Sequence, residues 1–136
     1  MPRKKVMRQE LADTGVLVNF AGVEIARLTL NGLIIINEQE LFYSIVHGAN
    51  KQGEWCPMTY LCQVYGYAGT WGYDISVDNA VRDLATLEVI TLKMSEGNPR
   101  QIHSVRPMMS VREAVKHIPR YTTRAETIAG LEHLDD

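Results

Sequence analysis

Three amphipathic segments followed by a hairpin pattern constrain the fold of this chain more than any other feature. The first segment begins at Asn37, which has Glu40 three residues later and so takes the form of a capping box. Pro57 suits the first turn of a second helix, and Ser76 suits the N-cap of a third. Residues 89–106 then alternate in polarity around a turn, which is typical of a β-hairpin. This order predicts an α+β fold built on a three-helix core.

The same patterns predict where the helices end and which residues they bury. The glycine-bounded stretch 48–53 is expected to end the first helix. Apolar residues at helical spacing predict the buried faces of the second and third helices. These residues are Met58, Leu61, Cys62, Tyr65, Val77, Ala80, Val81, Leu84 and Leu87.

Residues 15–36 precede the helices and carry strand signals. Residues 16–20 alternate with period two, and Asn31-Gly32 is a strong hairpin turn ahead of an apolar run. A small β-meander is therefore expected as an N-terminal extension. Residues 23–30 also fit one face of a helix that ends at Gly32, and this alternative stays open.

Length and charge indicate one domain with two polar ends. The 136 residues suit a single core, and the formal net charge of −2 favours neither nucleic acid nor membrane. We expect a basic mobile arm at 1–14, a domain at 15–121 with its core at 37–107, and an acidic tail at 122–136. Neither a membrane span nor a secretory signal is expected, so the predicted location is cytoplasmic, with no membrane partner.

Nothing in the sequence favours catalysis. Phosphate-binding glycine loops and the zinc-protease helix motif are missing from it, so we expect no enzyme, no catalytic residue and no cofactor. Cys56 and Cys62 have no neighbouring histidine or second cysteine pair, which argues against a metal site. Free, half-buried thiols are expected instead.

Two stretches carry a resemblance to a known family. The segment ANKQGEWCP contains a Gly-x-x-x-Pro spacing ahead of the second helix, and SVDNAVRDLATLEVITL runs from a capping serine through a buried face into a strand. In these features the chain resembles winged helix-turn-helix DNA-binding proteins, most closely small phage or plasmid regulators and replication accessory proteins. The resemblance implies a recognition helix near 76–88, a wing near 89–106 and a short strand at 53–57.

Double-stranded DNA is the partner that this resemblance implies, for a transcription regulator or a replication or partition accessory protein. The residues expected to contact DNA are Asn79, Arg82, Arg100, His103, Arg106, Lys51, Arg3, Lys4, Lys5 and Arg8. Two departures from the family stand out. Asp78 and Asp83 would face the polyanion, and residues 66–75 make a longer connection than the family's tight turn.

An alternative reading gives the chain a protein partner. Tyr67, Trp71 and Tyr73 lie close together in sequence, and aromatic residues are common interface anchors. In this hypothesis the chain is an interaction module of a mobile element that binds or inhibits a host protein. A homodimer formed through residues 15–36 or through a last short helix expected at 111–118, with Ser110 as its cap, is a further expectation.

Overall fold

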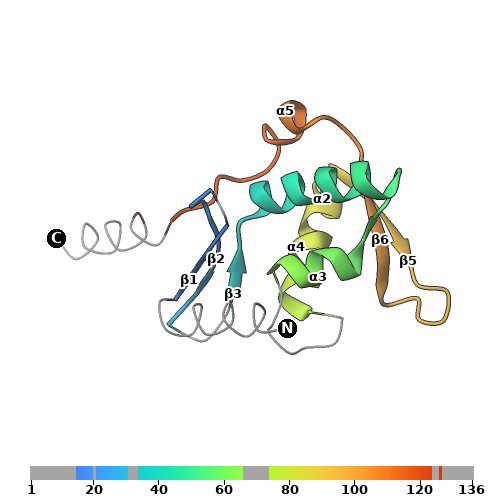
Figure 1. Cartoon of the computed structure of the whole chain (residues 1–136), viewed down its shortest axis with the longest axis horizontal. Helices are drawn as coiled ribbons and strands as arrows, with labels where there is room; N and C mark the ends of the chain where they lie inside the picture. Colours follow the sequence, from blue (N-terminus) through green and yellow to red (C-terminus); the bar gives the residue numbers. More distant parts are fainter. Residues whose placement is uncertain (1–14, 20, 31–33, 66–73, 124–125, 127–136) are drawn as a thin grey trace.

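The computed structural model describes residues 15–19, 21–30, 34–65, 74–123 and 126. Helices lie between two small antiparallel sheets in this part of the chain, so the predicted α+β class is confirmed (Figure 1). The elements are β1 (Val16–Val18), β2 (Glu24–Leu28), β3 (Ile34–Ile36), α2 (Glu38–Gln52), β4 (Cys56–Pro57), α3 (Met58–Tyr65), α4 (Ile75–Thr86), β5 (Ile90–Met94), β6 (Ile102–Pro107) and α5 (Val111–Ala114).

Strands β1, β2 and β3 form the N-terminal sheet in that order, which confirms the predicted β-meander. The helical alternative for 23–30 is wrong, because β2 pairs antiparallel with both of its neighbours. The register aligns Leu17, Ala26 and Ile36 on one face, and all three side chains are buried. Burying this row against the helices outweighs the weak helical spacing.

Helix α2 begins as its sequence predicts. The Asn37 side chain accepts a hydrogen bond from the backbone N–H of Glu40 at 3.3 Å. It also donates to the carbonyl of Glu24 at 2.9 Å, which ties the start of the helix to β2. One residue therefore caps the helix and fixes its angle to the sheet.

Gly48 does not help to end α2, contrary to the expectation that the helix stops across 48–53. The helix continues to Gln52 and ends at Gly53, whose φ of 105° favours glycine. A Cβ placed on Gly48 would lie 2.5 Å from the Sγ atom of Cys56. Gly48 is thus required because β4 packs directly against the helix backbone.

The second helix begins one residue after its predicted start, and the N-cap of the third lies two residues before the predicted one. Pro57 belongs to β4, so α3 starts at Met58. Asp74 rather than Ser76 caps α4, accepting from the backbone N–H groups of Ser76 and Val77 at 2.9 and 3.1 Å. The predicted core residues of both helices are buried except Leu87, which is partly buried as the C-cap residue of α4.

Strands β4, β6 and β5 form the C-terminal sheet in that order, with β6 in the centre. Cys56 pairs with Val105, and both are fully buried against the helices. The two sheets lie at opposite ends of the helical layer (Figure 1). No helix among the described residues is long and apolar enough to cross a membrane.

Candidate nucleic-acid interface

The outer face of the C-terminal sheet gathers two cations around an aromatic ring. Cross-strand pairing sets Thr91 opposite Arg106 and Lys93 opposite Ser104, so these four residues share one face. Trp55 directly precedes the strand partner of Val105 and reaches the same face. The Arg106 guanidinium lies 4.9 Å from the centre of the Trp55 ring, and the Lys93 ammonium lies 5.6 Å from it.

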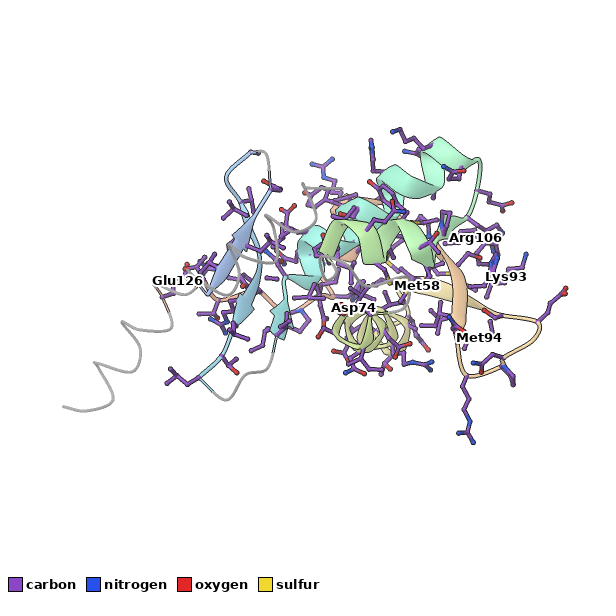
Figure 2. The ribbon with its side chains drawn as sticks, turned by 60° about the horizontal axis from the view of Figure 1, so that its bottom comes forward. Met58, Asp74, Lys93, Met94, Arg106 and Glu126 are labelled. Atoms are coloured by element: carbon purple, nitrogen blue, oxygen red, sulfur yellow. The ribbon has the colours of Figure 1, made fainter. Side chains whose placement is uncertain are left out.

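Side-chain positions on this face leave Lys93 available to solvent. Lys93 is exposed, whereas the Arg106 side chain is 38% exposed and also pairs with Glu54. Contact with the ring holds both cations at cation–π distance and restricts their motion. Lys93 and Arg106 point outward at the same end of the molecule, opposite the end that carries Glu126 (Figure 2).

Sequence reasoning identified Arg106 but missed Trp55 and Lys93. Lys93 lies two residues after Thr91 on a predicted strand, so alternation alone was a sufficient signal for it. Trp55 had no such signal. Its position follows only from the pairing of β4 with β6, which joins segments far apart in the chain.

Arg100 occupies the loop between β5 and β6 and is exposed. Backbone hydrogen bonds fold this loop, including one from Ser95 N–H to the Gln101 carbonyl at 2.8 Å. Arg100 N–H donates to the Asn98 side chain at 3.1 Å. His103 is exposed on β6, with its Nδ1 3.1 Å from the Ser104 hydroxyl. The loop therefore presents one cation from a defined backbone.

Arg82 connects α4 to this loop instead of standing free. Its Nε donates to Asp78 Oδ2 at 2.8 Å, and its Nη2 donates to the Arg100 carbonyl at 2.6 Å. The expectation that Asp78 faces a polyanion is wrong, because Asp78 is buried and paired with Arg82. Through these two bonds, Arg82 and Asp78 fix the angle between α4 and the hairpin.

The outward face of α4 carries an amide, an apolar side chain and one charge of each sign. Asn79 is exposed, as predicted, and Ile75 one turn earlier is 70% exposed. Asp83 is exposed one turn later, as expected. The Arg82 side chain remains 42% exposed beside this face. This helix offers an amide and an apolar side chain to a partner, with a single restrained cation.

The remaining predicted residues fall into two groups. Lys51 is exposed in the last turn of α2, where a cation is favoured by the helix dipole. The basic residues predicted near the start of the chain and the aromatic residues predicted in the long connection lie outside the described residues. They are Arg3, Lys4, Lys5, Arg8, Tyr67, Trp71 and Tyr73.

Neither cysteine is placed for chemistry. Both thiols are free, as expected, and both are buried rather than half-buried. Burial raises the pKa of Cys56 to about 12 and also raises that of Cys62, so both stay protonated at neutral pH. Across the described residues, no group of three or more His, Cys, Asp or Glu side chains is arranged to hold a metal ion.

No family model matches the chain, and neither the curated proteins nor the solved structures contain a significant match.

Proposed function

We propose that this chain is a double-stranded DNA-binding protein of winged helix-turn-helix type, with α4 as its recognition helix and the β5–β6 hairpin as its wing. The observation that carries the proposal is the cationic end of the molecule. Lys93 and Arg106 flank Trp55 on the C-terminal sheet, and Arg100 projects from the hairpin loop. Exposed cations on a rigid hairpin are suited to DNA phosphates.

The order of the elements supports this assignment. A helix, a short strand, two helices and a hairpin follow one another from α2 to β6, and the short strand β4 completes the sheet of the hairpin. This is the order that the resemblance implied. Such a protein would serve as a transcription regulator or as a replication or partition accessory protein of a phage or plasmid.

The role proposed for each residue follows from the exposure of its side chain and from its hydrogen bonds. Arg100 and Lys93 neutralise phosphates, while Asn79 on α4 is suited to an adenine edge in the major groove. Arg82 keeps the hairpin at a fixed angle to α4 through Asp78 and the Arg100 carbonyl. Binding is therefore expected to be strongly salt-dependent and weakly sequence-specific.

A titration of labelled duplex at two salt concentrations tests this function. Arg100→Ala should weaken binding to all sequences and lower the slope of log affinity against log salt by about one. Asn79→Ala should leave that slope unchanged and cost about 1–3 kcal/mol at a preferred site only. Absence of salt-sensitive binding by the parent protein contradicts the proposal.

One observation favours a protein partner instead. Ile75 is 70% exposed beside Asn79 on a helix face that carries Asp83, and such a face is unusual for a DNA-reading helix. In this second candidate function α4 docks onto a host protein, which the mobile-element module binds or inhibits. Its affinity would be nearly independent of salt, and Ile75→Asp would abolish it while Arg100→Ala would have no effect.

A further inference from the structure

A pocket lies between the N-terminal sheet, helices α2 and α4, and the segment that follows α5. Its volume is about 450 Å³, within the roughly 300–1,000 Å³ typical of small-molecule sites. Ile35, Leu87 and Tyr121 contribute apolar walls, and carboxyl groups enter from Glu38 and Asp83. The lining residues come from the N-terminal sheet, α2, the C-terminal end of α4 and residues 119–122, and not from the cationic face of the C-terminal sheet.

The two carboxyl groups face one another. Glu38 lies in the first turn of α2 and Asp83 in the last turn of α4, and their side chains hydrogen-bond to each other. Such a bond requires that one carboxyl keeps its proton. Burial, reinforced by Asp83, raises the pKa of Glu38 to about 8. Among the described residues no cation pairs with either group.

The dipole of α4 also favours positive charge beside these carboxyl groups. Asp83 stands near the carboxyl end of α4, where the backbone carbonyls already concentrate negative potential. A second carboxylate there is unfavourable, and a bound cation is favourable. A larger cation can therefore take the place of the proton shared by the two carboxyl groups.

Two arginines also line the pocket, but each is engaged by the segment after α5. Arg27 Nη1 donates to the Thr122 carbonyl at 2.7 Å, and its guanidinium lies 5.5 Å from the centre of the Tyr121 ring. Arg120 Nη2 pairs with Glu126 at 3.2 Å. The guanidinium groups thus hold the pocket wall together, and the carboxyl pair remains for a ligand.

We propose that this pocket binds a small organic cation, a primary ammonium or guanidinium group carried on a short apolar stem. The charged head bonds to Glu38 and Asp83 in place of their shared proton, and the stem packs against Ile35, Leu87 and Tyr121. This inference does not depend on DNA binding.

Binding of the organic cation releases the shared proton, so the affinity of the pocket for the cation rises with pH. Glu38 loses its proton near pH 8 in the free protein. The other groups that face it from neighbouring elements are Asp83, Arg27, Arg120 and Tyr121. Burial raises the pKa of Tyr121, which stays neutral. An alkylammonium stays charged over the same pH range, since a lysine side chain titrates at about 10.4.

Calorimetric titration of the full chain with n-hexylammonium tests the proposal, with hexanoate as the anionic control of equal length. Hexylammonium should bind at least about tenfold more tightly at pH 8.5 than at pH 6.5, because the cation competes with the proton. Amide and methyl NMR shifts should change at Ile35 and Leu87. Equal or tighter binding of hexanoate, or no binding of hexylammonium, overturns the proposal.

Neutral variants identify the ligands of the cation. Glu38→Gln and Asp83→Asn should each weaken hexylammonium binding by about tenfold, as expected for loss of a charged hydrogen bond. Glu38→Gln should also remove the pH dependence. Glu40→Gln, in the same turn of α2 but outside the pocket lining, should bind like the parent. An equal loss in Glu40→Gln contradicts the assigned site.

Discussion

The two sheets of this protein are both three-stranded and antiparallel, but their outer faces differ in what covers them. Each has three antiparallel strands with one face buried against the helices. On the N-terminal sheet, the outward Arg27 is covered by the segment after α5 through Tyr121 and Thr122. On the C-terminal sheet, the outward Lys93 and Arg106 lie against the Trp55 ring, Arg106 also pairs with Glu54, and Lys93 is exposed.

The difference lies in the outward residues of the two sheets. Inward positions are apolar in both sheets and fix the register. Outward positions on the N-terminal sheet contact another part of the same chain, whereas Lys93 on the C-terminal sheet is exposed to solvent. The predictions below test whether the two ends differ in this way.

The largest effect is expected from the core that the two sheets share. Leu84 is fully buried in α4, and this helix contacts both β3 and β5. Leu84→Ala should therefore cost about 2–5 kcal/mol of unfolding free energy. Denaturation followed by hydrogen exchange should show both sheets losing protection together. Loss of protection in only one sheet would mean that the two ends fold independently.

The next effect concerns the Glu38–Asp83 pair, which lies at the N-terminal end only. The pKa of Glu38 is raised from 4.5 to about 8, so between these values the folded protein holds a proton that the unfolded chain has released. Stability therefore falls as pH rises through this window and levels off above pH 8. After allowance for solvent screening, the unfolding free energy of the parent should fall by about 2 kcal/mol more across this window than that of Glu38→Gln.

Urea titrations at pH 5, 6.5 and 8 measure this dependence, with Glu40→Gln as the matched control. That control should keep the profile of the parent. A parent whose stability rises from pH 5 to pH 8 would show that the two carboxyls do not share a proton.

The packing of α2 on the C-terminal sheet gives a smaller effect. Alanine normally improves a helix by about 1 kcal/mol over glycine, but a Cβ on Gly48 meets Cys56 Sγ at 2.5 Å. Gly48→Ala should cost about 1–2 kcal/mol net, and adding Cys56→Ala should recover part of that loss. Gly97→Ala, with open space around it, should change stability by less than about 0.5 kcal/mol. A stabilised Gly48→Ala variant would refute the close contact.

The smallest effect tests how the segment after α5 packs on the N-terminal sheet. The Tyr121 hydroxyl donates to the carboxylate of Glu24 on β2. Tyr121→Phe keeps the ring and removes this bond, so it should cost about 1 kcal/mol. Exchange should quicken in β2 and remain unchanged in β6, whereas Tyr43→Phe on the exposed side of α2 should alter neither strand. Equal quickening in both sheets would contradict a local role.

Local signals predicted much of the fold and little of the site. The Asn37 cap, the buried faces of α3 and α4 and the β5–β6 hairpin follow from neighbouring residues, and the structure confirms them. Gly48 was misread because its role depends on Cys56 from another element. Asp78 was placed outside although its i,i+4 spacing from Arg82 on the same helix was a signal for the ion pair that the structure contains.

The missed features have a common cause. Trp55 joins the cationic face only through the pairing of β4 with β6, and Glu38 meets Asp83 only when α2 crosses α4. These contacts join residues distant in sequence, so no spacing rule within one segment signals them. Asp74 and Ser76 are both residue types that cap helices, and in the structure Asp74 caps α4.

The central claim is that the C-terminal sheet, and not the N-terminal end, contacts DNA. Its most direct test compares the salt slope of duplex binding in Lys93→Ala/Arg100→Ala with that in Arg120→Ala, an equally exposed arginine at the other end. The account predicts that the double variant lowers the slope by about two and that Arg120→Ala leaves it unchanged. An equal loss in Arg120→Ala, or an unchanged slope in the double variant, would contradict it.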